Sequence, residues 1–378
     1  MRAALFTILF VISSSLVSAS AEKPPLEEYA KKLTFRAATL SPDGSKIAML
    51  VRTDEQLRMI VYKTSGEPIL QAPIDDIKAN SLQFYSNNHV ILRASETTRV
   101  RGFRGEFENS GSISVNLETK QASLLLDRTD DIFPAQSGVG GILGRGPNGN
   151  TVLMRAYMGS AYNDNPPNNL LQVNLDTGKG VTILRGRNRT YQWIADGSGG
   201  ALARIDYNNR SNKFEVLKRD GSKWETIFET VSDIPPFRVS GILPDKSGLV
   251  FVDSRDDKDG FDEIRALKLD GTFTGPLFEP RDREIRRIYY DTDRALLGVR
   301  YETEQNEEYE FLDAAHQASY ESKNEKYSGA IIYLIDWSDD RSQVLYRLYA
   351  GGVGKYYVIP QPATDEVQFM ANLLPNIP

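Results

Sequence analysis

The chain has 378 residues, with two histidines and no cysteine. A hydrolase nucleophile needs a base beside it, which histidine often supplies, and thiolate metal sites need cysteine. Neither His89 nor His316 has partners at the spacing of a catalytic triad or a metal site, so we expect both to be structural. The sequence therefore predicts no thiol chemistry, no metal site and no cofactor.

A serine hydrolase of the α/β type carries its nucleophile in a G-x-S-x-G turn between a strand and a helix. This pattern is absent from the sequence. The nearest segment, residues 196–200 (DGSGG), lacks the first glycine and lies in a predicted hairpin. We therefore predict no catalytic residue in this chain.

Acidic residues gather at 253–263 (DSRDDKDGFDE). A calcium-binding EF-hand loop with Gly260 at its sixth position needs an acid at Arg255 and a glutamate at Ala266, so the spacing fails. We interpret the segment as a hairpin between two strands, with a surface cation site as the alternative. The arginines around 99–104 and 281–287 are interpreted as solvated loops, with carboxylate binding as the alternative.

One repeated pattern supplies the elements that hold these residues: an apolar strand, a polar turn and a second apolar strand. Its clearest copy is 38–50 (ATLSPDGSKIAML), in which Ser-Pro-Asp-Gly is a strong hairpin turn. Seven copies follow one another at intervals of 45 to 60 residues, with turn anchors at Asp43, Asn88, Asn148, Asp196, Asp245, Asp293 and Asp340. Four-stranded repeats of this period are typical of propeller blades. The sequence predicts an all-β, seven-bladed β-propeller over residues 37–371.

Two helices are expected outside this pattern. A short helix at 26–33 follows Pro24 and Pro25 in an N-terminal linker, residues 22–36. A second helix of about 10–15 residues is expected as an insertion in the sixth blade, within residues 307–328.

Residues 1–21 have the parts of a secretory signal peptide: basic Arg2, an apolar run at 3–17 and a small-residue site ending at Ala21. The apolar run is too short to favour a membrane span, and no second run follows. We expect cleavage near Ala21 and export to a bacterial periplasm or secretion, without membrane insertion. A formal net charge of −6 argues against nucleic acid as a general partner.

Several segments resemble the β-propeller half of the prolyl oligopeptidase family of serine peptidases. They are 40–48 (LSPDGSKIA), 311–313 (FLD), 332–340 (IYLIDWSDD) and 354–358 (GKYYV), and the similarity is greatest to the bacterial dipeptidyl-aminopeptidase and acylaminoacyl-peptidase-like branch. Ser-Pro-Asp-Gly repeats also occur in periplasmic TolB-like propellers. In the peptidase family an α/β-hydrolase domain follows the last blade, and we expect the tail at 372–378 to stand where that domain would begin.

The resemblance implies a non-catalytic propeller that gates access for peptides or binds them, with peptides or a separate hydrolase as partners. The alternative is a free-standing, TolB-like periplasmic propeller that acts as a binding or protein-interaction scaffold. Dipeptidyl peptidases of the family hold the substrate amino group with a pair of propeller glutamates, a role that the resemblance implies for Glu307 and Glu308. The alternative for these two acids is a helix N-terminus, which favours negative charge.

Overall fold

The structure, a computed structural model, describes residues 35–53, 56–74, 77–99, 104–134, 136, 138–253, 262–278, 283–302, 307–350, 353–360 and 368–372. The predicted signal peptide, the predicted helix at 26–33 and the residues from 373 onward lie outside this part. Within it, no helix has the length and apolar character that a membrane span requires.

The described strands form seven antiparallel sheets that follow one another along the chain. The first sheet contains β1 (Phe35–Leu40), β2 (Lys46–Thr53), β3 (Gln56–Lys63) and β4 (Pro68–Pro73). The second contains β5 (Lys78–Ser86), β6 (His89–Thr98), β7 (Phe107–Asn116) and β8 (Ala122–Leu124). The third contains β9 (Ile142–Arg145), β10 (Thr151–Tyr157), β11 (Asn168–Asn174) and β12 (Gly180–Leu184). The fourth contains β13 (Thr190–Ala195), β14 (Ala201–Asn208), β15 (Lys213–Asp220) and β16 (Lys223–Val231).

The last three sheets are less uniform. The fifth contains β17 (Val239–Ile242), β18 (Gly248–Asp253) and β19 (Glu263–Lys268). The sixth contains β20 (Ile285–Tyr290), β21 (Leu296–Glu302) and β22 (Glu307–Phe311). The seventh contains β23 (Ile331–Trp337), β24 (Gln343–Ala350), β25 (Val353–Pro360) and β26 (Gln368–Asn372). The prediction of four strands in every unit is therefore wrong for the fifth and sixth sheets in the part of the chain that the structure describes.

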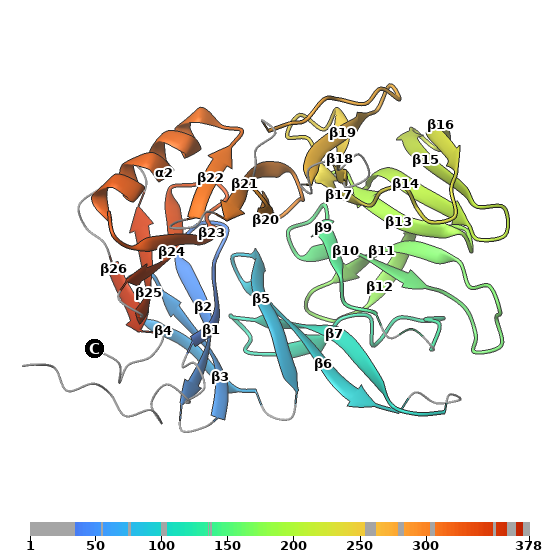
Figure 1. The fold of residues 1–378 in the computed structure, drawn as a ribbon. Helices are drawn as coiled ribbons and strands as arrows, with labels where there is room; N and C mark the ends of the chain where they lie inside the picture. The colour runs from blue at the N-terminus through green and yellow to red at the C-terminus, as the bar shows by residue number, and fades with distance from the viewer. Residues whose placement is uncertain are drawn as a thin grey trace, which may run out of the picture.

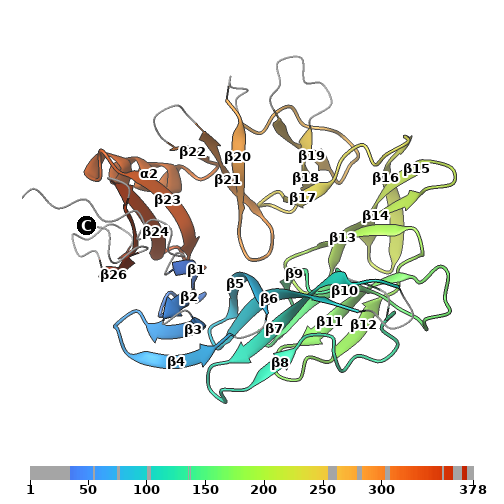
Figure 2. The same cartoon turned by 60° about the horizontal axis from the view of Figure 1, so that its bottom comes forward.

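The sheets are arranged in a ring, with the first strand of each sheet toward its centre (Figures 1 and 2). The predicted all-β propeller is confirmed. Each predicted turn anchor lies between the first and second strands of its own sheet. In the first of these turns Asp43 Oδ1 accepts a hydrogen bond from Ser45 N at 3.0 Å, and Gly44 has a φ of 69°, a conformation that glycine adopts without strain.

The one helix of the described part, α2 (Ala314–Lys326), follows β22 and contacts it (Figure 1). The predicted insertion is confirmed, but it begins later than the acidic residues suggested, because residues 307–311 pair with β21 as a strand. Asp313 caps the helix, since its Oδ1 accepts a hydrogen bond from His316 N at 2.9 Å. The helix thus takes the chain position that a fourth strand has in other sheets.

Apolar side chains fill the spaces between neighbouring sheets. Leu50 and Met59 of the first sheet pack in one cluster with Phe84 and Leu92 of the second. In the fourth sheet Trp193 is 1% exposed, and its Nε1 donates a hydrogen bond to Asn168 O of the third sheet at 2.9 Å. The core is therefore radial, which is the arrangement that a propeller requires.

The first and seventh sheets share no strand among those described, and hydrogen bonds join them. Asp339 N donates to Pro42 O at 2.7 Å. Asp336 of β23 accepts hydrogen bonds through Oδ2 from Leu40 N, at 2.9 Å, and from the Thr39 hydroxyl, at 2.5 Å. Its Oδ1 accepts from Trp337 N at 2.9 Å. Burial raises the pKa of the Asp336 carboxyl, and these hydrogen bonds oppose that effect. The Asp336 carboxyl therefore connects the N-terminal and C-terminal sheets.

A second polar contact connects sheets that are not neighbours in the chain. Arg145, at the end of β9, pairs through Nη2 with Asp293 Oδ2 at 2.9 Å and through Nη1 with Asp339. These two acids lie in the first hairpin turns of the sixth and seventh sheets. Arg145 therefore holds three of the seven anchor turns together.

Candidate functional site

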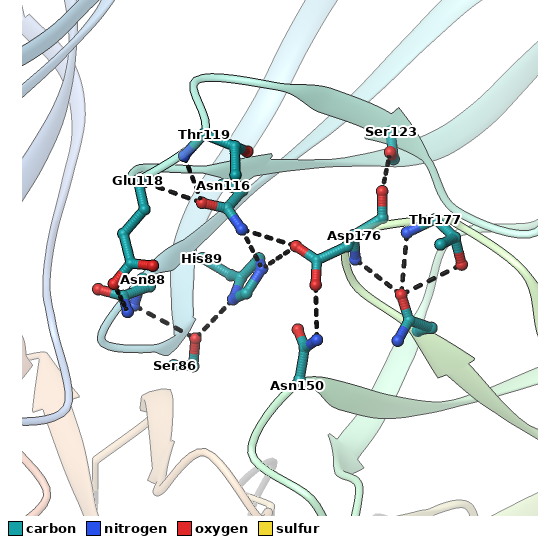
Figure 3. A network of polar contacts seen from close by, with 11 residues as sticks. Ser86, Asn88, His89, Asn116, Glu118, Thr119, Ser123, Asn150, Asp176 and Thr177 are labelled. Atoms are coloured by element: carbon teal, nitrogen blue, oxygen red, sulfur yellow. Dashed lines mark hydrogen bonds and ion pairs between the residues drawn. The ribbon is translucent and has the colours of Figure 1, made fainter.

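His89 lies at the start of β6, in a network of polar side chains that joins the second sheet to the third (Figure 3). Its Nδ1 is 2.8 Å from Ser86 Oγ, and its Nε2 is 2.9 Å from Asp176 Oδ1. His89 thus has a serine and a carboxylate partner, although sequence spacing indicated neither. Asp176 stands 87 residues further along the chain, in the turn after β11, so sequence spacing gave no sign of the contact.

The orientation of this Ser–His–Asp group differs from that of a catalytic triad. In the serine protease template the serine faces Nε2 and the aspartate faces Nδ1, whereas here the two nitrogens are exchanged. Asp176 also accepts hydrogen bonds from Asn116 Nδ2 and Asn150 Nδ2, each at 2.6 Å. His89 is only 5% exposed. Asp176 thus accepts hydrogen bonds from three side chains, and the group connects the second sheet to the third as a structural contact.

Hydrogen bonds from His89, Asn116 and Asn150 lower the pKa of Asp176 to about 2. A carboxyl whose pKa is lowered by folding contributes stability above its ordinary pKa and loses that contribution as the pH falls toward the lowered value.

We expect Asp176→Ala to lower the free energy of unfolding by about 1–2 kcal/mol at pH 7, because three donors lose an acceptor while water can replace part of it. The difference from the unaltered protein should shrink as the pH falls from 4 toward 2. Urea unfolding at several pH values measures it. Asp130→Ala is the control, because the Asp130 side chain is 88% exposed and pairs with the exposed Lys179 at 3.6 Å. Equal effects of the two substitutions would contradict the structural role.

A cavity of about 700 Å³ lies between α2 and the strands of the sixth and seventh sheets. We call it the α2 cavity. Most of its wall is apolar and comes from Leu297, Phe311, Leu334, Trp337, Val344 and Tyr346. A cavity of this size with mainly apolar walls and a few polar groups is typical of a ligand site.

The polar groups of the α2 cavity come mostly from one face of the helix. Lys323 is 2% exposed, and its Nζ donates a hydrogen bond to Ser319 Oγ at 3.0 Å. Burial, with a smaller effect of Lys326, lowers the pKa of Lys323 to about 8. Burial and then the charge of Arg341 also lower the pKa of His316, whose Nδ1 is 3.4 Å from Arg341 Nη1.

The two carboxylates that line the α2 cavity, Asp313 and Asp340, accept hydrogen bonds from residues close to them in the chain. Asp313 caps the helix through His316 N, and this hydrogen bond lowers the pKa of its carboxyl. Asp340 Oδ1 accepts hydrogen bonds from Ser338 Oγ at 2.7 Å and from Ser342 N at 2.9 Å. Among the described residues neither Lys323 nor Arg341 forms an ion pair with these acids, whereas His316 Nδ1 lies 3.7 Å from Asp313 Oδ1.

The structure does not bring Glu307 and Glu308 together. Both lie in β22, and consecutive residues of a strand point to opposite faces of the sheet. Glu307 Oε2 is 3.3 Å from Arg300 Nε, whereas Glu308 pairs with Arg283. The alternative of a helix N-terminus is wrong, because both acids lie in β22 and Asp313 caps α2. Binding of a substrate amino group by Glu307 and Glu308 stays a prediction.

The acidic segment 254–261 lies outside the described residues, but its flanks are visible. Asp253 at the end of β18 faces Glu263 at the start of β19, so the segment does connect two antiparallel strands as expected. Among the described residues, no three His, Asp or Glu side chains are grouped so that they could hold a metal ion.

No protein-family model matches the sequence, and a search of curated proteins finds no match. Solved structures do match. The β-propeller domain of the trilobed protease from Pyrococcus furiosus, whose topology is described as open velcro, aligns with a TM-score of 0.52 at 8% identity, over 91% of this chain and 97% of that one. A prolyl endopeptidase aligns with a TM-score of 0.53 at 9% identity, over 90% of this chain and 50% of that one.

The chain has the propeller fold of these peptidases. Prolyl oligopeptidase B from Galerina marginata agrees, with a TM-score of 0.52 at 10% identity over 90% of this chain. This propeller spans about half the length of the two prolyl peptidases. TolB from Acinetobacter baumannii aligns over 63% of the chain with a TM-score of only 0.28, which decides nothing. At these identities the likeness establishes the fold alone, and at that level the resemblance expected from the sequence is confirmed.

Sequence reasoning missed Lys323 and Ser319. Their spacing of four residues places both on one face of a helix, which is a weak sign that they interact. Lysines on helices are nearly always solvated, so nothing in the sequence marked this one as buried.

Proposed function

We propose that this propeller binds short peptides in the α2 cavity and has no hydrolase activity of its own. The observation that carries the proposal is the cavity itself, which has the volume and the mainly apolar wall of a ligand site. The likeness to the propellers of prolyl peptidases supports peptides as the ligand class. The reversed orientation of Ser86, His89 and Asp176 supports the lack of activity.

The proposal includes the architecture and the location. Each of the seven sheets forms one blade, which the placement of one anchor turn in each sheet supports. Export rests on the signal-peptide pattern of residues 1–21. The alternative is a free-standing, TolB-like periplasmic propeller that acts as a binding or protein-interaction scaffold.

Substitution of Ala318 by tryptophan should block the α2 cavity. Ala318 lines the cavity from the helix and is exposed, so a large side chain can enter the cavity without disturbing the core. We expect calorimetric titration with short peptides carrying Leu, Phe or Tyr to show at least about a tenfold loss of affinity, which is about 1.4 kcal/mol. Ala314→Trp is the matched control, because Ala314 is exposed on the same helix but does not line the cavity.

Equal peptide affinity of the Ala318→Trp and unaltered proteins would exclude the cavity as the binding site. Binding of a folded protein, with no peptide binding by the unaltered propeller, would favour the scaffold. The same preparations should not hydrolyse dipeptidyl or acyl-peptide chromogenic substrates. Turnover that disappears in Ser319→Ala or Ser86→Ala would overturn the proposal that the chain is inactive.

A further inference from the structure

The Lys323 ammonium is buried with few interactions that stabilise its charge. It is 2% exposed, and Ser319 Oγ is its only hydrogen-bond acceptor in the described part of the chain. An ammonium has three N–H donors, and burying it without a carboxylate is costly. The Tyr346 ring, with its centroid 5.9 Å from Nζ, offers a weak cation–π contact at most.

The charges around Lys323 leave its ammonium uncompensated. No ion pair within 4.0 Å joins Lys323 to a carboxylate among the described residues. Asp313 and Asp340, the carboxylates of the cavity wall, are occupied in the helix cap and in the turn after β23. Arg341 adds a second cation to the wall, and Lys326 on the same helix repels the ammonium.

Packing of the side chain at position 323 does not require an amine. A methionine has similar length and would fill the same space without the cost of a buried charge, as replacements of buried ionic groups by apolar ones show. An uncompensated cation in the wall of a ligand-sized, mainly apolar cavity indicates instead an anionic ligand group that enters from outside.

We propose that the α2 cavity binds a carboxylate next to an apolar group, and that Lys323 pairs with that carboxylate. This inference rests on the proposed function, and it specifies the ligand as a peptide with an apolar C-terminal residue and a free C-terminus. The apolar side chain packs against Leu334 and Val344, which line the cavity and are buried. The carboxylate takes the two N–H donors of Lys323 that Ser319 does not use.

The test compares N-acetyl-Leu-Leu with a free C-terminus and the same dipeptide as its C-terminal amide, by calorimetric titration at pH 7. The unaltered protein should bind the acid at least about tenfold more tightly than the amide. Lys323→Met should bind both with equal affinity. Lys326→Met, the matched control on the same helix, should keep the preference, because Lys326 does not line the cavity.

The outcomes separate the inference from the proposed function. Equal binding of acid and amide by the unaltered protein would overturn the carboxylate site and leave peptide binding intact. No binding of either ligand would overturn peptide binding in this cavity. Titration with octanoate distinguishes the source of the carboxylate: tight binding that depends on Lys323 would assign the site to a fatty acid, and weak binding supports a peptide. Because the first comparison uses the unaltered protein, it does not depend on whether a variant folds.

Discussion

Replacement of Asp336 by alanine is expected to lower the free energy of unfolding by about 3 kcal/mol or more, because each buried donor left without an acceptor costs about 1–3 kcal/mol. Three donors lose their acceptor: the Thr39 hydroxyl, Leu40 N and Trp337 N. The first two belong to the first sheet, whereas Asp336 belongs to the seventh. The substitution therefore weakens the closure of the ring as well as one turn.

Urea unfolding followed by tryptophan fluorescence measures this loss, and Asp336→Asn is the matched variant. The amide keeps one oxygen acceptor and the shape of the side chain, so it should lose less stability than alanine does. An alanine variant as stable as the asparagine variant would show that these hydrogen bonds do not hold the ring closed.

The pH dependence of Asp336→Asn provides a second readout of the same site. Burial raises the pKa of this carboxyl, so the folded chain retains a proton over a pH range in which the unfolded chain has lost it. Its contribution to stability is therefore full below the ordinary pKa of 3.8 and declines as the pH rises through the raised pKa. Asparagine does not titrate. We expect the stability of Asp336→Asn, relative to the unaltered protein, to increase as the pH rises above 4.

Replacement of Arg145 by methionine is expected to lower the free energy of unfolding by about 2 kcal/mol, which is less than the roughly 3–5 kcal/mol for removing one partner of a fully buried ion pair. The Arg145 side chain is 29% exposed and that of Asp293 is 18% exposed, so water replaces the lost contact only in part. Arg145 N also donates to Asp293 Oδ1, at 3.2 Å, and this backbone contact survives the substitution.

A double-mutant cycle with Asp293→Asn isolates the energy of the ion pair. The two substitutions together should cost less than the sum of the single costs, because each removes the same interaction. Arg155→Met is the control, because Arg155 bonds only weakly to Tyr191 O, at 3.4 Å. Additive effects of Arg145→Met and Asp293→Asn would contradict a stabilising role for the contact between anchor turns.

Local patterns predicted the strands well, and the reason lies in turn chemistry. Ser-Pro-Asp-Gly at 41–44 forms a hairpin from its own hydrogen bonds, since Asp43 accepts from Ser45 N within the turn. The weaker anchors, such as Asn88 and Asp293, also fall between the first two strands of their sheets. In each case a few adjacent residues are enough to predict the hairpin turn.

In the sixth sheet, the run of acidic residues predicted secondary structure less well than the hairpin turns did. Glu307 and Glu308 looked like the start of a helix or a ligand clamp, but β21 pairs with them and the strand separates their side chains. Helix preference of single residues is worth only a few tenths of a kcal/mol, so pairing with a neighbouring strand overrides it. The helix begins only where Asp313 offers a cap.

The sequence alone determined the repeated hairpins, the all-β propeller and the position of one inserted helix, because each depends on residues close together in the chain. Only the tertiary structure decided which side chains meet across sheets: Asp176 with His89, Asp336 with Leu40, and Arg145 with Asp293. It also decided the burial of Lys323, whose surroundings come from the seventh sheet as well as from its own helix. Solvation of a charge depends on what packs over it, and no local pattern records that.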